Sequence, residues 1–207
     1  MTRALLRAGA AAISVAAALA LTACGQPPGP AAPPLVADSI VTTPAEPAST
    51  AAPRPSVATG YSVSIAKIGA SSSLVPLGIN PDKTIQVPPV SQPQQAGVYK
   101  YGPVPGDPGP AVILGHVNGG GRPGVFARLA DVSIGDEVDV ARPDGRTAVF
   151  RVYRIQTVDK SEFPTSAVYS NTPGAELRLI TCGGDLNRAA HSYLSNVIVF
   201  AALQRSR

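Results

Sequence analysis

One of the two cysteines of the chain, Cys182, ends the apolar run "ELRLITC" and is followed by two glycines. A cysteine is nucleophilic as its thiolate, and a neighbouring imidazolium or guanidinium stabilises that form. The chain offers two histidines, His116 and His191. His116 follows the apolar run "AVILG" and precedes the glycine-rich "VNGGGRPG", whereas His191 has no comparable run before it. The pattern favours His116 as the partner of Cys182 in cysteine chemistry.

Attack of a thiolate on a carbonyl also needs a group that stabilises charge on the carbonyl oxygen. Arg188 lies six positions beyond Cys182 (188 minus 182), in the segment expected to form the next loop, and is close enough in sequence to serve. Thr181 offers a hydroxyl beside the thiol. A structural interpretation stays open, in which His116 caps a strand, Arg188 is solvated, and Cys182 is a small buried apolar side chain.

The metal-binding residue types do not cluster in the sequence. One cysteine and two histidines fall short of a closed four-ligand zinc site and show no paired ligand spacing. The Asp and Glu residues are scattered along the chain. We therefore expect no metal and no cofactor.

The N-terminus has the pattern of an export signal, with Arg3 and Arg7 before an alanine-rich apolar run that ends at Ala23. The run is shorter than the ~20 residues usually needed to span a bilayer, although an uncleaved membrane helix stays an alternative. The ending "LTAC" resembles a bacterial lipobox, which implies cleavage before Cys24 and attachment of diacylglycerol to its thiol. We expect a signal peptide over residues 1–23 and a lipid anchor at Cys24, on the extracytoplasmic face of the membrane.

Composition divides the rest of the chain into two parts. Residues 24–60 are rich in Pro, Ala, Ser and Thr and contain no aromatic residue until Tyr61, which predicts an extended or disordered tether. Residues 61–207 have the length of one domain. The formal net charge is +4, and no basic run interleaves with aromatic residues, so nucleic acid is not an expected partner.

Short β-branched runs separated by Gly, Pro, Asn and Asp predict an all-β barrel or sandwich. The expected strands are "YSVSIAKI", "SSLVPLGI", "AVILGH", "DEVDVAR", "TAVFRVYRIQTV", "ELRLITC" and "NVIVFAAL". The turn residues Pro143, Asp144 and Gly145 predict a hairpin between the fourth and fifth of these. The spacing of Val125 and Phe126 with Leu129 favours a short helix over residues 124–132.

Several of these segments, in their order, resemble the sortases of Gram-positive bacteria, and specifically the actinobacterial type called class F. The resemblance rests on "AVILGHVN", "LITCGGDLNR" and "SYLSNVIVFA" and covers nearly all of residues 61–207. It implies a closed sortase-type β-barrel of about eight strands with one or two short helices. It places the family's histidine at His116, its nucleophile at Cys182, and the arginine of the class F pattern at Arg188.

The resemblance implies a membrane-anchored cysteine transpeptidase. Such an enzyme cleaves LPXTG-type sorting signals of secreted proteins between Thr and Gly, through an acyl-enzyme on Cys182. An amine of a peptidoglycan precursor or cross-bridge then resolves the acyl-enzyme. Two alternatives stay open: a thiol hydrolase on the same fold, and a non-catalytic envelope lipoprotein whose β-domain binds a partner.

The sequence departs from the better-known sortases at one position. In those enzymes the essential arginine lies at the start of the last strand, where this chain aligns Asn196. The family also points to the loop before the cysteine strand, Val158 to Gly174, as the wall of the substrate groove. Its apolar residues Phe163, Pro164, Ala167 and Val168 could hold a Leu-Pro pair or simply pack the loop.

Overall fold

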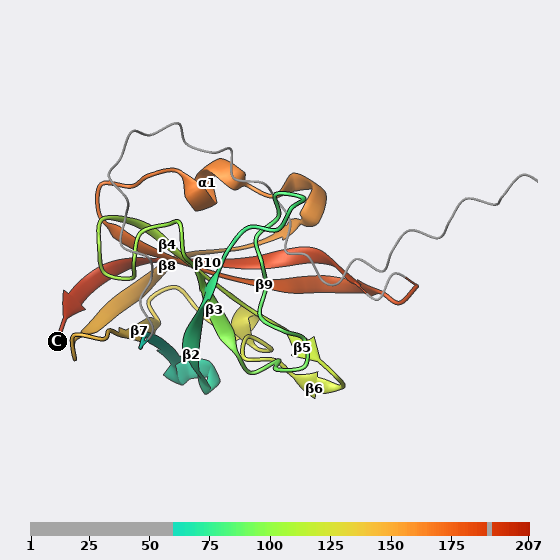
Figure 1. The fold of residues 1–207 in the computed structure, drawn as a ribbon, viewed down its shortest axis with the longest axis horizontal. Coiled ribbons are helices and arrows are strands. Elements are labelled where there is room, and N and C mark those ends of the chain that lie inside the picture. The colour runs from blue at the N-terminus through green and yellow to red at the C-terminus, as the bar shows by residue number, and fades with distance from the viewer. Residues whose placement is uncertain (1–59, 190–191) are drawn as a thin grey trace, which may run out of the picture. The chain divides into compact units, whose positions relative to one another are not determined.

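The computed structural model describes residues 60–189 and 192–207. Eight strands close into a barrel in the order β1-β2-β3-β4-β9-β10-β8-β7, and β5 and β6 form a small separate hairpin (Figure 1). The barrel strands are β1 (Ser62–Ile65), β2 (Ala70–Leu77), β3 (Ala96–Tyr99), β4 (Gly109–Gly115), β7 (Glu137–Ala141), β8 (Thr147–Asp159), β9 (Ala175–Asn187) and β10 (Ser192–Ser206). The other elements are β5 (Asn118–Gly119), β6 (Arg122–Pro123), η1 (Ala66–Ile68), η2 (Leu129–Asp131), η3 (Lys160–Glu162) and α1 (Thr165–Tyr169).

The closed eight-stranded barrel confirms the expected fold class, and each of the seven expected strands is found. The hairpin turn at Pro143 to Gly145 is confirmed as well: Arg142 and Arg146 pair across it, and Gly145 has a φ of 80°. The short strand β3 was not expected, because its four residues, "AGVY", carry too little alternation to stand out.

Two expectations about elements were wrong. Residues 124–132 do not form an α-helix: a series of turns leads into the 3₁₀ helix η2, and Val125, Phe126 and Leu129 are all buried in the barrel core. Cys182 does not end its strand either, because β9 continues to Asn187. The residues after Cys182 still pair with β10. The change from apolar to polar residues at Cys182 therefore marks the edge of the core and not the end of the strand.

Side chains on the two faces of the barrel wall form two separate cores. The inner core fills the barrel, since all eight barrel strands contribute to it; among its fully buried members are Ile65, Phe126, Phe150, Leu179 and Val199. The outer core lies on the opposite face of β4, β9 and β10, under α1. It consists of Leu77, Ile85, Tyr99, Val112, Leu114, Phe163, Val168, Ile180, Cys182, Ile198 and Phe200.

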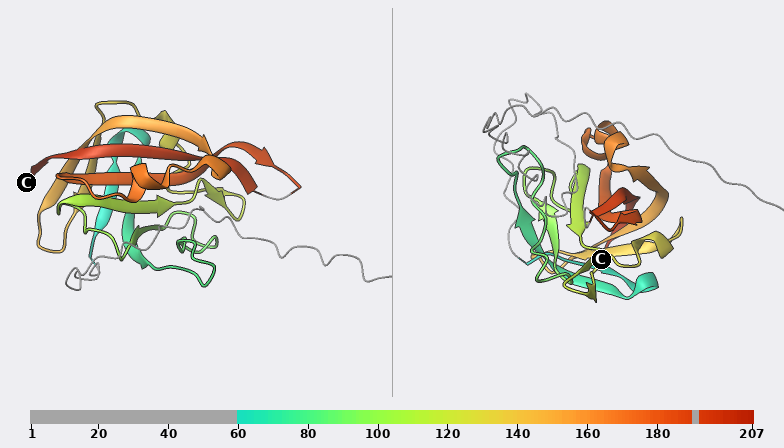
Figure 2. Two further views of the ribbon diagram at one scale, coloured as in Figure 1. Left: turned by 90° about the horizontal axis from the view of Figure 1, so that it is seen from above. Right: turned by 90° about the vertical axis from the view of Figure 1, so that its right-hand side faces the viewer.

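The strands β9 and β10 form the longest hairpin of the protein. Their ladder contains ten residue pairs, and both strands extend past the rest of the barrel, as Figures 1 and 2 show. A bulge interrupts the ladder where Gly183 pairs with Ser195 and Leu186 with Tyr193. Gly184 sits in this bulge with a φ of 71°, a conformation that favours glycine.

The chain turns sharply after β4 and packs back against it. The backbone oxygen of His116 accepts a hydrogen bond from the amide of Phe126 (3.0 Å), and the amide of Gly124 donates to Val117 (2.9 Å). A Cβ atom on Gly124 would lie 2.1 Å from the His116 oxygen. Glycine at position 124 therefore lets the turn hold the His116 backbone in place.

We predict that Gly124→Ala lowers stability by about 1–3 kcal/mol, because the added methyl group must push the His116 backbone away. Urea unfolding checks this value. Gly174→Ala is the matched control, since a Cβ there meets no atom within 4 Å, and its stability should be unchanged or slightly raised. Equal stability of the two variants would contradict the proposed role of Gly124.

Candidate active site

The pairing of β4 with β9 brings His116 and Cys182 to the same level of the barrel wall. The two strands are parallel, and their paired residues, from Gly109↔Ala175 to Leu114↔Ile180, all differ by 66 in residue number. His116 and Cys182 also differ by 66 (182 minus 116). His116 directly follows β4, two positions past the last pair of this ladder, so a continued register would set it beside Cys182 on the adjacent strand.

Both side chains face the outer core. Val112 and Leu114 precede His116 at alternate positions of β4, and Ile180 precedes Cys182 on β9; all three belong to the outer core. Because side chains alternate between the two faces of a sheet, His116 and Cys182 lie on that same outer face. The structure therefore brings together the two residues that the sequence favoured for cysteine chemistry.

The two groups are covered in this structure, with 4% of each residue exposed. The Nε2 atom of His116 lies 2.6 Å from the backbone oxygen of the buried Pro88. A carbonyl oxygen only accepts, so Nε2 is the donor in this contact and carries a proton. The segment that contains Pro88 also borders a surface hollow of about 450 Å³, lined by Leu77, Ile85 and Val87 among others.

Asn196 completes the row on the other side of Cys182. It pairs with Cys182 across the antiparallel β9–β10 ladder, so the two side chains share a face. On its far side Asn196 pairs with Val158 of β8. Cys182, Asn196 and Val158 thus form one row across β9, β10 and β8 on the outer face, and His116, just after the end of β4, continues this row.

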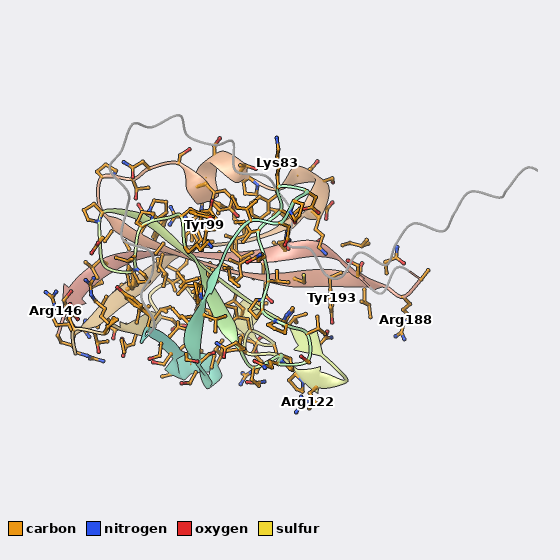
Figure 3. All side chains as sticks on the ribbon, viewed as in Figure 1. Lys83, Tyr99, Arg122, Arg146, Arg188 and Tyr193 are labelled. Carbon is orange, nitrogen blue, oxygen red and sulfur yellow. The ribbon has the colours of Figure 1, made fainter. Side chains whose placement is uncertain are left out.

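Arg188 does not lie in this row. It occupies the exposed turn at the tip of the β9–β10 hairpin, beyond Tyr193 and far from α1 (Figure 3). Strand β9 continues past Cys182 to Asn187, and Arg188 follows it. Because residues of an extended strand are spaced ~3.3 Å apart, Arg188 is roughly 15–20 Å from Cys182. Arg188 lies far from Cys182 because β9 continues past Cys182. The sequence did not indicate this continuation, because the residues after Cys182 are no longer apolar.

Thr181 and the two glycines have structural roles in this arrangement. Thr181 pairs with Val197 of the inner core and therefore faces the barrel interior, away from the Cys182 thiol. A Cβ on Gly183 would lie 2.6 Å from a methyl carbon of Val197, so that glycine makes room for packing. Gly184 supplies the positive φ of the bulge.

The loop before β9 closes over the outer core. It contains η3 and α1, and it buries Phe163 and Val168 in the same cluster as Cys182, while Ala167 packs at its edge. Two of the apolar residues that the sequence suggested for a substrate groove thus pack against the sheet in this structure. Tyr169 joins them, with its ring centre 6.3 Å from Phe163 and 6.2 Å from Tyr99.

This aromatic cluster brings no charge to the site. Burial, and next the neighbouring Tyr99, raise the pKa of the Tyr169 hydroxyl. Burial and then Tyr101 raise the pKa of the Tyr99 hydroxyl. Both phenols stay protonated at neutral pH, since burial disfavours their ionised form.

A buried arginine, Arg178, ties the α1 loop to the sheet. It is 2% exposed, forms an ion pair with Glu176 at 2.7 Å, and donates to the Ala167 oxygen at 3.3 Å. Its guanidinium lies 4.7 Å from the centre of the Phe200 ring. A role for this residue was not expected from the sequence, although an arginine inside the apolar run "ELRLIT" was a signal that it has a buried partner.

Comparison with known proteins identifies the family of the chain. The family model described as "Sortase domain" matches residues 63–204, about two thirds of the chain. The chain belongs to the sortase family. No curated protein matches the sequence of this sortase.

Solved sortases share the fold at low sequence identity. Sortase A from Corynebacterium diphtheriae aligns with a TM-score of 0.55 and 20% identity, over 73% of this chain and 63% of that one. Sortase A from Listeria monocytogenes gives 0.55 and 17%, over 72% and 90%. Sortase C from Clostridium perfringens gives 0.52 and 15%, over 71% and 70%. At these identities the likeness shows the barrel fold alone.

Several expectations fall outside the described residues, namely Cys24, the signal peptide, the tether up to residue 59 and His191. Within residues 60–189 and 192–207, no helix is long and apolar enough to cross a membrane. The same residues hold no group of three or more His, Cys, Asp or Glu side chains that could bind a metal ion.

We predict that Arg178→Met destabilises this sortase by about 1–3 kcal/mol, because it removes charged hydrogen bonds and leaves Glu176 without its ion pair. Urea unfolding measures the loss. Arg151→Met is the control: Arg151 pairs with Glu137 at the surface at 3.5 Å, and exposed pairs contribute little. A stability of Arg178→Met equal to that of the control would show that Arg178 does not anchor the loop.

Proposed function

We propose that this sortase is a class F enzyme that cleaves LPXTG-type sorting signals between Thr and Gly and joins the new end to a cell-wall amine. The observation that carries the proposal is the position of Cys182 on β9 and of His116 just after the end of the adjacent parallel strand β4, both toward the outer core. The pair has the residue types and the proximity that nucleophilic cysteine catalysis needs. The alternatives to a transpeptidase are the thiol hydrolase and the binding lipoprotein.

In the proposed reaction the Cys182 thiolate attacks the Thr carbonyl carbon of the sorting signal. The His116 imidazolium then gives its proton to the leaving glycine amine, and a thioester remains on Cys182. An incoming amine attacks the thioester, His116 accepts a proton from it, and the thiolate leaves. Because His116 and Cys182 are each 4% exposed, we expect peptide binding to displace part of the cover over the outer core.

Arg188 remains a prediction from the class F pattern. At the tip of the hairpin it is placed to contact a bound protein or peptide outside the catalytic row. To reach a carbonyl held at Cys182, the tip of the hairpin would have to fold back over the outer face of the sheet.

We predict that incubation with a Leu-Pro-Ala-Thr-Gly peptide gives an adduct on Cys182, detected by intact mass. Adding a diaminopimelate-type amine should convert the adduct to a new amide product. Cys182→Ala should form neither species, and His116→Gln should slow the reaction by about 10²–10⁴-fold, since it removes the general acid.

The outcomes separate the three functions. Release of free Leu-Pro-Ala-Thr with no amide product would favour the thiol hydrolase. An unmodified Cys182 in folded protein would favour the binding lipoprotein. Full cleavage by Cys182→Ala would reject cysteine catalysis altogether.

We also propose that this sortase is held at the extracytoplasmic face of the membrane by a lipid on Cys24. The support is the sequence alone: the "LTAC" ending directly follows the apolar run of an export signal. Two acyl chains give stable anchoring where a single chain binds only marginally. The tether of residues 24–60 would then carry the catalytic domain away from the bilayer surface.

We predict that Cys24→Ser, expressed with its own N-terminus in a bacterium that processes lipoproteins, loses the mass of the diacylglycerol group. It should also leave the detergent-extractable membrane fraction, whereas Cys182→Ser should stay there as the wild type does. Retention of Cys24→Ser in the membrane with an intact N-terminus would instead support an uncleaved membrane helix.

A further inference from the structure

Asn196 is the polar side chain that the barrel wall places directly beside the Cys182 thiol. The two residues are paired in the β9–β10 ladder. Cβ atoms of directly opposite residues are about 4.5–5.5 Å apart, and their side chains point to the same face. The carboxamide of Asn196 is therefore within reach of atoms bonded to the Cys182 sulfur.

The environment of Asn196 is unusual for an amide. The residue is 0% exposed, and neither Nδ2 nor Oδ1 has a hydrogen-bond partner among the described residues. Buried side-chain amides are nearly always hydrogen-bonded, because an unsatisfied polar group costs stability. An amide kept in such a position beside a nucleophile indicates a partner that is present only when substrate is bound.

Two other candidate donors, Thr181 and Arg188, lie elsewhere. Thr181 also has a buried hydroxyl with no hydrogen-bond partner in the described chain, but it faces the inner core. Arg188 lies at the exposed tip of the hairpin. Within the row, His116 is assigned to the leaving group and Val158 is apolar.

We propose that the Nδ2–H group of Asn196 binds the oxyanion formed when Cys182 attacks the substrate carbonyl. This inference rests on the proposed acyl-transfer function and names the group that stabilises its transition state. The C–S bond forms as the C=O π electrons move to the oxygen, which Asn196 then holds by a hydrogen bond. As the carbonyl re-forms, the C–N bond breaks and the leaving nitrogen takes the proton of His116.

The buried position strengthens this interaction. A donor that is fixed in place before the reaction, with water excluded, stabilises developing charge more than a solvated donor does. Asn196 is fixed by its place in the middle of a strand that pairs on both sides. The substrate oxygen would supply the hydrogen-bond partner that Nδ2 lacks in this structure.

The test compares acylation with alkylation in the full-length protein. Acylation by a Leu-Pro-Ala-Thr-Gly peptide passes through an oxyanion, whereas iodoacetamide alkylates Cys182 by substitution at a saturated carbon. Asn196→Leu, of similar size but without a donor, should lower the acylation rate about 10²–10³-fold and leave the alkylation rate within about twofold. Its unfolding temperature should be unchanged or raised, because an unsatisfied buried amide is removed.

Thr181→Val is the matched control, since it removes the other unsatisfied polar group from the opposite face of the same ladder. It should acylate within about threefold of the wild-type rate. Arg188→Ala tests the alternative donor. If Asn196→Leu does not fold, Asn196→Ala gives the same comparison with a smaller side chain.

The outcomes are distinct. Wild-type rates of acylation in both Asn196 variants would overturn the inference while leaving the proposed function intact, and so would an equal fall in acylation and alkylation. A large loss in Arg188→Ala without one in Asn196→Leu would assign the oxyanion to Arg188 instead. If the wild-type thiol alkylates normally but forms no thioester, the proposed function fails and this inference fails with it.

Discussion

The parallel pairing of β4 with β9 is the contact on which the candidate site depends. The two strands are separated by some sixty residues of chain, yet they keep one register throughout. A shift of this register by one residue would move the Cys182 thiol to the other face of the sheet from the His116 ring. The well-filled inner core fixes the register, since Ile113 and Leu179 pack into the barrel from these same strands.

Because side chains alternate along the strands, one face of the barrel wall forms the inner core and the other carries the candidate site. The inner face of β9 and β10 is mostly apolar, with Thr181 as an exception, and fills the barrel core, whereas the outer face carries the thiol of Cys182 and the amide of Asn196 beside apolar residues. Such a face needs a cover, which α1 and the preceding loop provide. Arg178 holds this cover through the Ala167 oxygen, while Glu176 neutralises the buried charge of the arginine.

The buried amide of Asn196 on the outer face is not explained by the stability of the fold. The buried amide of Asn196 gains nothing from its surroundings in this structure, so packing alone gives no reason for an asparagine there. Position 196 would be better filled by an apolar residue if the protein only had to fold. Sites of chemistry are where proteins most often accept such a cost.

The sequence by itself determined the all-β class and the two residues of the candidate pair, because both follow from local patterns, while resemblance to a family gave the closed barrel. Alternating β-branched runs with turn residues between them indicate strands. An apolar run that stops at His116 or Cys182 indicates a polar group at the edge of a core. Resemblance to the sortase family supplied the reaction.

Only the tertiary structure decided which groups join that pair. Strand β9 continues past Cys182 through polar residues, because ladder hydrogen bonds to β10 need no apolar side chains, and this carries Arg188 to the tip of the hairpin. The same ladder sets Asn196 opposite Cys182 and turns Thr181 to the interior. Cross-strand register is a property of two segments together, so neither segment alone could reveal it.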